Sequence, residues 1–167
     1  MKNFFFLLLP VLLLLYSCSV TRYYLVRHAE KICEDCETCA LVIPEGQDRA
    51  KALRDYLTGK GIDTIFTSQC LRTKLTAKPL ADALHKSAGI YQTSQLTSFI
   101  NKLKGFNGKN ILVVGHSDQI PVMIDSLAHR HVNIDQDDFD NMFIVTKKKC
   151  LTSSIQLQSL TYGEPSP

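Results

Sequence analysis

The chain has 167 residues, a hydrophobic fraction of 45% and a formal net charge of +3. This length suits one ordinary domain that buries a core, and no internal repeat, low-complexity tract or Pro/Gly-rich linker marks a second domain. The mild charge argues against a nucleic-acid-binding protein, because such proteins usually carry a strong basic excess.

The start of the chain has the pattern of an export signal. Lys2 precedes an apolar run over residues 4–15, which is short for a membrane-spanning helix. The run ends at Leu15-Tyr16-Ser17-Cys18, which resembles a bacterial lipoprotein signal, in which cleavage leaves the cysteine as a lipid-bearing first residue. A plain secretory signal and an uncleaved anchor are the alternatives.

This interpretation divides the chain at Cys18. We expect residues 1–17 to be a signal peptide, residues 18–21 a short tether and residues 22–167 the folded domain. Lys2 is the only charged residue in the signal, so its removal lowers the net charge from +3 to +2. The mature protein is expected on the cell envelope, held to a bacterial membrane by a lipid on Cys18.

From residue 22 onward, strand and helix patterns alternate, as in an α/β layered domain. Short apolar, β-branched runs predict strands, and longer runs with one apolar face predict helices. Pro79 is expected to interrupt or kink the helix that contains it. In chain order we predict a strand at 22–27, a helix at 47–60, a strand at 62–67, helices at 71–86 and 95–103, a strand at 110–115, a helix at 121–128, and strands at 142–146 and 153–160.

Two of the predicted strands stop on a histidine. Residues 23–27 run into His28, and residues 111–115 run into His116. Ligands of parallel sheets bind at the carboxyl ends of strands, so both imidazoles and Arg27 would face one crevice. A guanidinium pairs with phosphate oxygens and a neutral imidazole is a competent nucleophile, so the pattern indicates a phosphate-transfer site.

A third candidate, Arg72, follows the predicted strand at 62–67. It lies in the first turn of a helix, where free backbone N–H groups and the helix dipole favour an anion. Alone, such an arginine is more typical of a solvated surface. Together with the two histidine motifs, it points to the same crevice.

These three motifs resemble those of the histidine phosphatase superfamily, which has the phosphoglycerate-mutase-like fold. Residues 25–31 resemble the Arg-His-Gly signature, with Ala29 in place of the glycine, residues 68–77 resemble the segment with the second phosphate-binding arginine, and residues 113–117 resemble the second-histidine segment. The resemblance implies a three-layer α/β/α domain with a mostly parallel central sheet, helices on both faces and no large cap insertion.

The resemblance also implies a mechanism. His28 would attack the phosphorus of a small phosphorylated substrate in line, and water would hydrolyse the resulting phosphohistidine. Arg27, Arg72 and His116 would bind the other phosphate oxygens. Because cationic side chains neutralise the charge, no metal and no other cofactor would be required.

The proton donor for the leaving oxygen departs from the family pattern. Many members carry a glutamate after the second arginine segment, but residues 91–96 contain no carboxylate. Asp118, two residues beyond His116, is the first candidate acid, Glu30 is the second, and the absence of a dedicated acid is the third possibility. Without an acid, phosphoanhydrides, phosphoramidates and aryl phosphates would react better than alkyl esters, because their leaving groups depart unprotonated.

The cysteines give a second set of clues. Cys33, Cys36 and Cys39 follow the nucleophile, and Cys70 lies beside Arg72; Cys150 is the last. In an oxidising envelope we favour disulfides, and a bridge between the first cluster and Cys70 would tether two walls of the pocket. A metal held by the three clustered thiols is the weaker alternative, because no neighbouring histidine completes a zinc ligand set.

Three charged clusters are interpreted as solvated surface: residues 129–131 at the end of a helix, the aspartate-rich residues 135–140, and Lys147–Lys149. The lysine run could also touch anionic lipid.

The sequence therefore predicts a metal-independent phosphatase anchored in the cell envelope. The runner-up is a phospho-ligand-binding protein that turns over poorly, which the missing glutamate and Ala29 motivate. A phosphoglycerate-mutase-type phosphotransferase is a third, weaker alternative, because an exported protein would not meet cytosolic metabolites.

Overall fold

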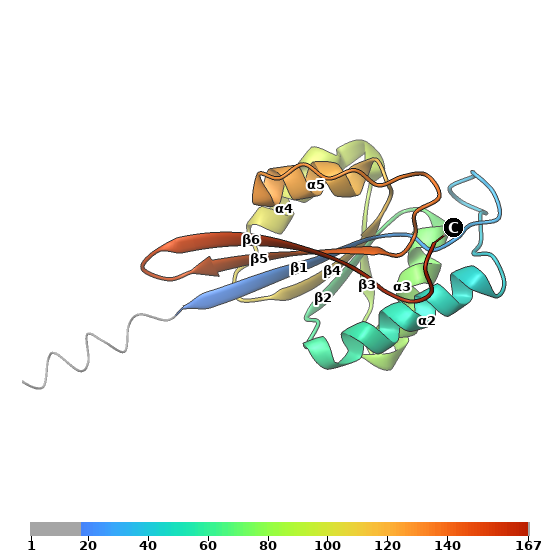
Figure 1. Cartoon of the computed structure of the whole chain (residues 1–167), viewed down its shortest axis with the longest axis horizontal. Coiled ribbons are helices and arrows are strands. Elements are labelled where there is room, and N and C mark those ends of the chain that lie inside the picture. The colour runs from blue at the N-terminus through green and yellow to red at the C-terminus, as the bar shows by residue number, and fades with distance from the viewer. Residues whose placement is uncertain (1–17, 167) are drawn as a thin grey trace, which may run out of the picture.

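A computed structural model describes residues 18–166, so the predicted signal segment lies outside the described residues. The fold is a six-stranded sheet with helices on both faces (Figure 1). The strands are β1 (Ser19–Arg27), β2 (Thr64–Ser68), β3 (Ala88–Tyr91), β4 (Asn110–Gly115), β5 (Asn141–Lys149) and β6 (Ser153–Thr161). The helices are α2 (Glu45–Leu57), α3 (Leu71–Ala83), α4 (Leu96–Lys104) and α5 (Gln119–Ala128), with short 3-10 turns η1 (Thr58–Lys60) and η2 (Thr93–Gln95).

The strand order is β3-β2-β4-β1-β5-β6. The first four strands of that order run parallel, and β5 and β6 are antiparallel additions at one side. The fold class predicted from the sequence, a three-layer domain with a mostly parallel sheet, is confirmed.

The central strands are apolar on both faces because each face is covered by a separate pair of helices. Along β1, Tyr23 and Leu25 join the core under α4 and α5, whereas Tyr24 and Val26 join the core over α2 and α3. The same alternation holds along β4 and β5. A period of two residues therefore supplies both cores from one run of apolar side chains.

Strand register brings the functional segments together. Arg27 at the end of β1 pairs with Gly115 at the end of β4, and Thr67 of β2 pairs with Val114. The His28 backbone N–H then donates to the Gly115 carbonyl at 2.9 Å, which extends the ladder by one residue. His28, His116 and Ser68 consequently follow three adjacent strands at one edge of the sheet.

The predicted elements are recovered with shifts of a few residues at most boundaries, and the following differences bear on the fold. Helix α3 is continuous across Pro79, so the predicted interruption is wrong; the proline removes one N–H donor without ending a helix that packs on the sheet. Strand β3 was not predicted, because its four residues are too few for a clear period. The helix predicted at 71–86 ends at Ala83. Residues 19–21 are not a tether, since they pair with Lys147–Lys149 in the sheet.

Within residues 18–166, no helix combines the length and the apolar character that crossing a membrane requires.

Candidate active site

A pocket of about 410 Å³ lies at the carboxyl ends of β1, β2 and β4. It brings together Arg27, His28, Arg72, His116 and Asp118, five of the residues that the sequence singled out. The remaining residues of its wall are Lys31, Glu34, Cys36, Gln69, Cys70, Thr93, Ser117, Gln119 and Gln136.

His28 is held as a neutral imidazole with one nitrogen available. It is only 2% exposed, and its Nδ1 lies 2.8 Å from the Ala29 carbonyl oxygen. A carbonyl can only accept, so Nδ1 carries the proton and Nε2 keeps its lone pair. Burial lowers the pKa of His28 to about 3, and the nearby His116 and arginines add to this effect. The ring is therefore uncharged and nucleophilic at neutral pH.

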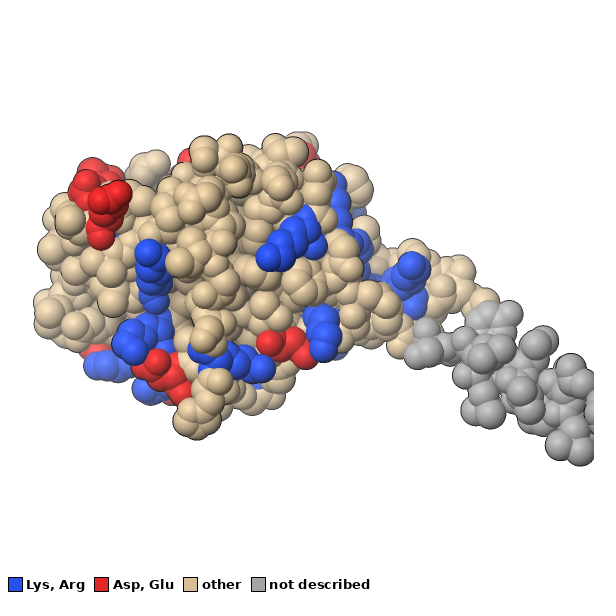
Figure 2. Space-filling view, turned by 180° about the vertical axis from the view of Figure 1, so that it is seen from behind, with Lys and Arg blue, Asp and Glu red and all other residues tan. Residues whose placement is uncertain are grey.

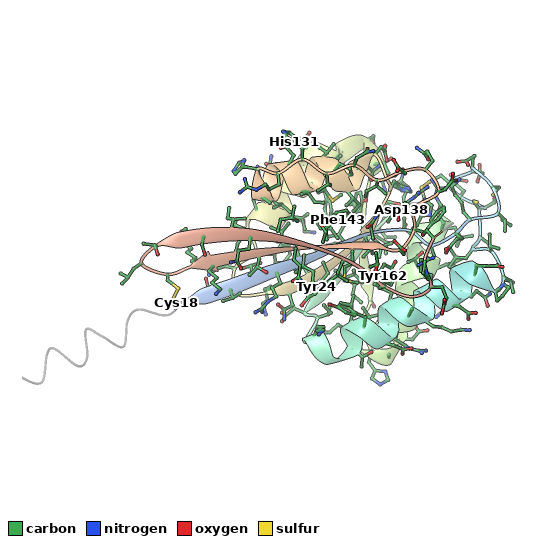
Figure 3. The ribbon with its side chains drawn as sticks, in the orientation of Figure 1. Cys18, Tyr24, His131, Asp138, Phe143 and Tyr162 are labelled. Atoms are coloured by element: carbon green, nitrogen blue, oxygen red, sulfur yellow. A yellow bond between two sulfur atoms is a disulfide. The ribbon has the colours of Figure 1, made fainter. Side chains whose placement is uncertain are left out.

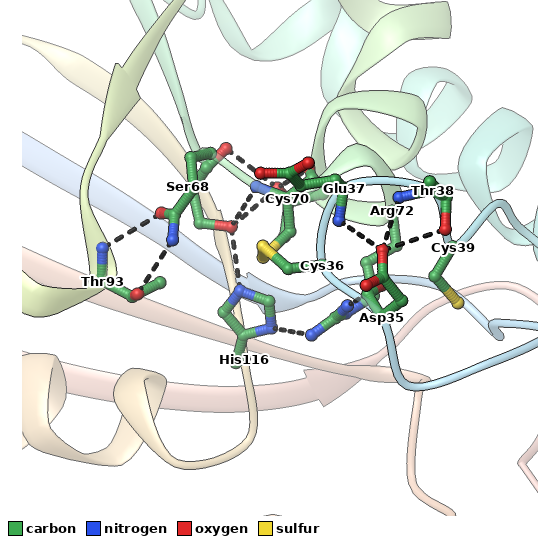
Figure 4. The surroundings of a disulfide bond; sticks show 12 residues. Asp35, Cys36, Glu37, Thr38, Cys39, Ser68, Cys70, Arg72, Thr93 and His116 are labelled. Carbon is green, nitrogen blue, oxygen red and sulfur yellow. Dashed lines mark hydrogen bonds between the residues drawn. A yellow bond between two sulfur atoms is a disulfide. The ribbon is translucent and has the colours of Figure 1, made fainter.

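His116 faces His28 with its ring centroid 5.3 Å away. Its Nδ1 lies 3.4 Å from Arg72 Nη2, and its Nε2 lies 2.8 Å from Ser68 Oγ (Figure 4). A guanidinium only donates, so Nδ1 accepts and the Nε2–H donates to Ser68. Burial and the neighbouring Arg72 lower the pKa of His116 to about 4. The free ring is thus neutral and would gain a proton most easily when an anion enters.

Arg27 is positioned by the loop between α5 and β5. Its Nη1 lies 2.9, 2.7 and 3.0 Å from the carbonyl oxygens of Asp135, Gln136 and Asp138. Its guanidinium carbon stacks 4.0 Å above the Phe139 ring. The aspartate-rich segment was interpreted as a solvated turn, and this interpretation is incomplete, because its backbone orients a pocket arginine. Side-chain charge alone did not reveal that role.

Arg72 is positioned by the loop that follows the nucleophile. Its Nη1 donates to the Asp35 carbonyl at 3.0 Å (Figure 4). The Nε atoms of Arg72 and Arg27 are both buried and have no hydrogen-bond partner within the part of the chain that the structure describes. Buried guanidinium N–H groups without partners are costly, so this cradle favours an anion with several oxygens.

Two small residues, Gly115 and Ala29, are the direct chain neighbours of the pocket histidines. A side chain at Gly115 would bring a Cβ within 2.8 Å of the Tyr91 hydroxyl and 3.0 Å of Ile120, so the residue before His116 must be glycine. Ala29, which replaces the family's glycine, is fully buried against Leu41 and Ala50. The structure therefore accommodates alanine at this position, because its methyl group packs in this small apolar cluster.

The two acid candidates lie in different places. Asp118 is exposed at the wall of the pocket, at the start of α5. Glu30 does not line the pocket: its Oε1 accepts from Arg49 Nε at 2.8 Å and from Nη2 at 2.6 Å. The same arginine donates to the carbonyls of Tyr162 and Glu164. The structure therefore does not place Glu30 where a proton donor would act, because its carboxylate lies outside the pocket and is bound by Arg49, which also binds the C-terminal segment.

A disulfide joins Cys36 to Cys70 between two walls of the pocket (Figure 4). The backbone adds to it, since the Leu71 N–H donates to the Cys36 carbonyl at 2.8 Å. Cys33 and Cys39 remain thiols, and no group of three or more metal-binding side chains converges within residues 18–166. With Cys36 in a disulfide, the clustered thiols do not form the proposed metal ligand set.

Cys18 is bonded to Cys150 in this structure (Figure 3). A lipid on Cys18 would need the same sulfur atom, so the disulfide and the lipid exclude one another. Lipidation of Cys18 therefore stays a prediction.

Sequence reasoning gave no role to two residues of the site. Ser68 belongs to the motif of residues 68–77, which predicts no separate role for it, yet it is the partner of His116 Nε2. Gln69 exchanges two hydrogen bonds of 3.0 Å with Thr93, so amide and hydroxyl groups occupy the wall beside residues 91–96. In the sequence, only the place of Gln69 directly after a predicted strand indicated that it could line the pocket.

A scan against protein-family models matches residues 23–97 to "Histidine phosphatase superfamily (branch 1)". That range includes Arg27, His28 and Arg72, whereas His116 lies beyond it. No curated protein matches the sequence.

Solved structures with the same fold cover nearly the whole domain. A protein proposed to be the phosphohistidine phosphatase SixA of Nakamurella multipartitia is 18% identical, with a TM-score of 0.61, and 88% of this chain and 97% of that chain are covered. The protein histidine phosphatase SixA complexed with tungstate is 14% identical, with a TM-score of 0.65, and the coverages are 84% and 96%. A phosphoserine phosphatase from Entamoeba histolytica, in complex with 3-phosphoglyceric acid, is 14% identical, with a TM-score of 0.58 and coverages of 80% and 96%.

Fold and site together resemble those of histidine phosphatases. The nucleophile, both arginines and the second histidine lie in one pocket at the carboxyl edge of a mostly parallel sheet. Residues 23–97 are thus similar to the histidine phosphatase superfamily, and the whole described domain has the fold of the solved phosphatase structures.

Proposed function

We propose that the protein hydrolyses small phosphorylated substrates through a phosphohistidine on His28 Nε2. The observation that carries this proposal is the neutral His28 ring, whose Nδ1 is fixed on the Ala29 carbonyl beside two arginines with unsatisfied Nε groups. This arrangement presents one lone pair to a phosphorus atom that the arginines hold.

In the first step, the Nε2 lone pair forms a bond to phosphorus while the bond to the leaving group breaks. Arg27, Arg72 and His116 bind the three equatorial oxygens as charge spreads over them. In the second step, water attacks the phosphohistidine, phosphate leaves, and the lone pair returns to Nε2. The cationic groups supply the charge neutralisation in both steps.

We infer that Asp118 protonates the leaving group, because it is the carboxylate next to His116 on the pocket wall. Its side chain is exposed to solvent, which limits how strongly it can assist the departure of a poor leaving group. Substrates with good leaving groups should therefore react best. A phosphoramidate or an aryl phosphate fits this site, and two of the structural relatives carry names that refer to histidine phosphatases.

The first test is turnover of an aryl phosphate in EDTA. Wild-type protein should release phosphate, and His28→Ala should lose all measurable activity, because no other side chain in the pocket replaces the nucleophile. Acid-labile, base-stable ³²P on the wild-type chain after a rapid quench would report the phosphohistidine. His85→Ala, on the surface after α3, is the matched control and should retain activity. Full activity of His28→Ala would contradict the mechanism.

The second test separates the acid from the nucleophile. Asp118→Asn should lower kcat/KM for an alkyl phosphate by about a hundredfold, the usual contribution of general acid catalysis, and for 4-nitrophenyl phosphate by much less. An equal loss on both substrates would mean that Asp118 acts in binding and not as the acid.

The runner-up function is a phospho-ligand-binding protein. The observation that favours it is the pair Gln69 and Thr93, which occupy with amide and hydroxyl groups the wall where the family pattern leads one to expect a glutamate. Tight phosphate binding by purified wild-type protein without turnover of either substrate would support binding over catalysis.

We further propose that the protein works in the cell envelope. The support is the sequence of residues 1–18, with its basic start, apolar run and Cys18. Mass spectrometry of the N-terminal peptide from a membrane fraction should find a lipid-modified Cys18. An intact Cys18–Cys150 disulfide in that fraction would overturn lipidation.

A further inference from the structure

Three of the segments that reach the end of the molecule opposite the pocket contain no acidic residue, and Asp63, just before β2, is a carboxylate beside them. Residues 18–26, 101–117 and 141–163 contain no Asp or Glu. The basic end, as we call it, comprises Arg22, Lys104, Lys109, Lys147, Lys148 and Lys149. Of these, Lys109 is paired with Asp63 at 3.0 Å. Figure 2 shows basic side chains along this narrow end of the molecule.

Strand geometry spreads the positive charge over both faces of this end. Successive side chains of a strand point to opposite faces, so Lys147 and Lys149 project to one face of β5 and Lys148 to the other. A hollow of about 390 Å³ lies between Lys104 and the three β5 lysines, with Thr21 and Ser153 in its wall. Its size and charge suit a phosphate-bearing head group.

An apolar side chain stands at the tip. Leu151, in the turn between β5 and β6, is 79% exposed, and Ile155 of β6 is 40% exposed. Exposed apolar side chains surrounded by lysines are typical of surfaces that lie on a bilayer.

The described part of the chain begins at the basic end. Strand β1 begins there at Ser19, paired with Lys149, and the apolar run of residues 4–15 precedes it by a few residues. The pocket lies at the other end of β1, so Cys18 and Asp138 are far apart in Figure 3. A domain that stood on its basic end would keep the pocket open to soluble substrates.

We propose that the basic end docks on an anionic phospholipid bilayer, with Lys147, Lys148 and Lys149 against the head groups and Leu151 at the acyl boundary. The occupant is the lipid surface, because the basic residues at this end outnumber its carboxylate Asp63, the tip is apolar and the chain enters the fold here at Ser19. This docking is independent of the phosphatase mechanism, since none of these residues lines the pocket.

The test uses the domain from Ser19 to Pro167, which contains every strand and helix and both core clusters and therefore retains the fold. Cys150→Ser is included in all variants, so that no free thiol cross-links the tip. The domain should sediment with vesicles of equal phosphatidylglycerol and phosphatidylcholine at low salt, and it should not sediment with pure phosphatidylcholine. High salt should release it.

The variant K147Q/K148Q/K149Q tests whether the three β5 lysines carry the vesicle binding. At about 1 kcal/mol per lysine, the triple change should weaken vesicle binding about a hundredfold. The control K51Q/K74Q/K78Q removes the same charge from α2 and α3 and should bind as the parent does. Aryl phosphatase activity, or phosphate binding if turnover is absent, serves as the folding check in both triples.

Leu151→Ser is a second variant, and it should weaken binding several-fold while leaving the salt dependence unchanged. Three results would overturn the proposal: equal binding to both vesicle types, equal loss in both triple variants, or binding to heparin that is tighter than binding to the anionic vesicles.

Discussion

At the scale of single residues, the site depends on how each imidazole nitrogen is occupied. His28 Nδ1 donates to a backbone carbonyl, and His116 Nε2 donates to Ser68, so each ring presents its other nitrogen to the pocket. Hydrogen bonds that fix a tautomer in this way are as important to the chemistry as the imidazoles themselves.

Ser68→Ala is expected to lower kcat about fivefold, because the loss of one hydrogen bond of about 1 kcal/mol leaves His116 free to rotate and to change tautomer. KM should change less, since the arginines still bind the phosphate. Steady-state kinetics with an aryl phosphate measure both constants. Thr73→Val removes the neighbouring hydroxyl at 2.9 Å from Ser68 and should have the smaller effect. A larger loss of kcat in the Thr73 variant would contradict the assignment of Ser68 as the hydroxyl that positions His116.

At the scale of elements, the pocket is assembled by segments that hold one another. The loop of residues 30–42 carries the carbonyl that binds Arg72, and the Cys36–Cys70 disulfide ties this loop to the first turn of α3. The buried ion pair of Arg49 with Glu30 ties the start of the same loop to α2 and to the C-terminal segment. The loop and the helices together therefore position the Arg72 guanidinium.

Cys36→Ser/Cys70→Ser is expected to raise KM several-fold, because the loop that holds Arg72 gains freedom and must be ordered when substrate binds. Dithiothreitol should produce the same rise in the wild type and no further rise in the double variant. Cys33→Ser leaves the bridge intact and should have wild-type kinetics. If dithiothreitol does not change KM although alkylation proves that the bridge is open, the tether has no role in binding.

Arg49→Met is expected to reduce the free energy of unfolding by about 3 kcal/mol, because it leaves the partly buried Glu30 without its cation and removes two bonds to backbone carbonyls. Arg54→Met on the same helix breaks only the exposed pair with Asp55 and should cost less than about 1 kcal/mol. Urea denaturation of the three proteins measures the difference. Adding Glu30→Leu to Arg49→Met should recover part of the loss.

At the scale of the whole molecule, the free energy of folding should depend on pH through the two pocket histidines. In the folded protein the pKa of His28 is about 3 and that of His116 about 4, both below the ordinary value of 6.5. Between the folded-state pKa values and pH 6.5, the unfolded chain therefore binds more protons than the folded protein does. The contribution of the two neutral histidines to stability is fully present above about pH 6.5, and it is lost as the pH falls toward 4.

Each histidine contributes a slope of up to about 1.4 kcal/mol per pH unit in that window. Urea unfolding of the phosphate-free protein at pH 7, 6 and 5 should show this decline, and His28→Asn should make it shallower. His129→Asn, at the exposed end of α5, should leave the slope unchanged. A slope that is the same in His28→Asn and wild type would mean that His28 is not held neutral by burial.

The sequence by itself determined the layers of the fold, because strands buried on both faces require continuous apolar runs such as residues 23–26 and 111–114. It also determined the four residues that meet in the pocket, since strand ends carry ligand-binding groups. Only the tertiary structure decided that Glu30 binds Arg49 and that Ser68 orients His116. It also decided that the carbonyls of Asp135, Gln136 and Asp138 hold Arg27. These contacts join segments far apart in the chain, and a side chain's partner depends on which segment packs beside it, which no local pattern of residues encodes.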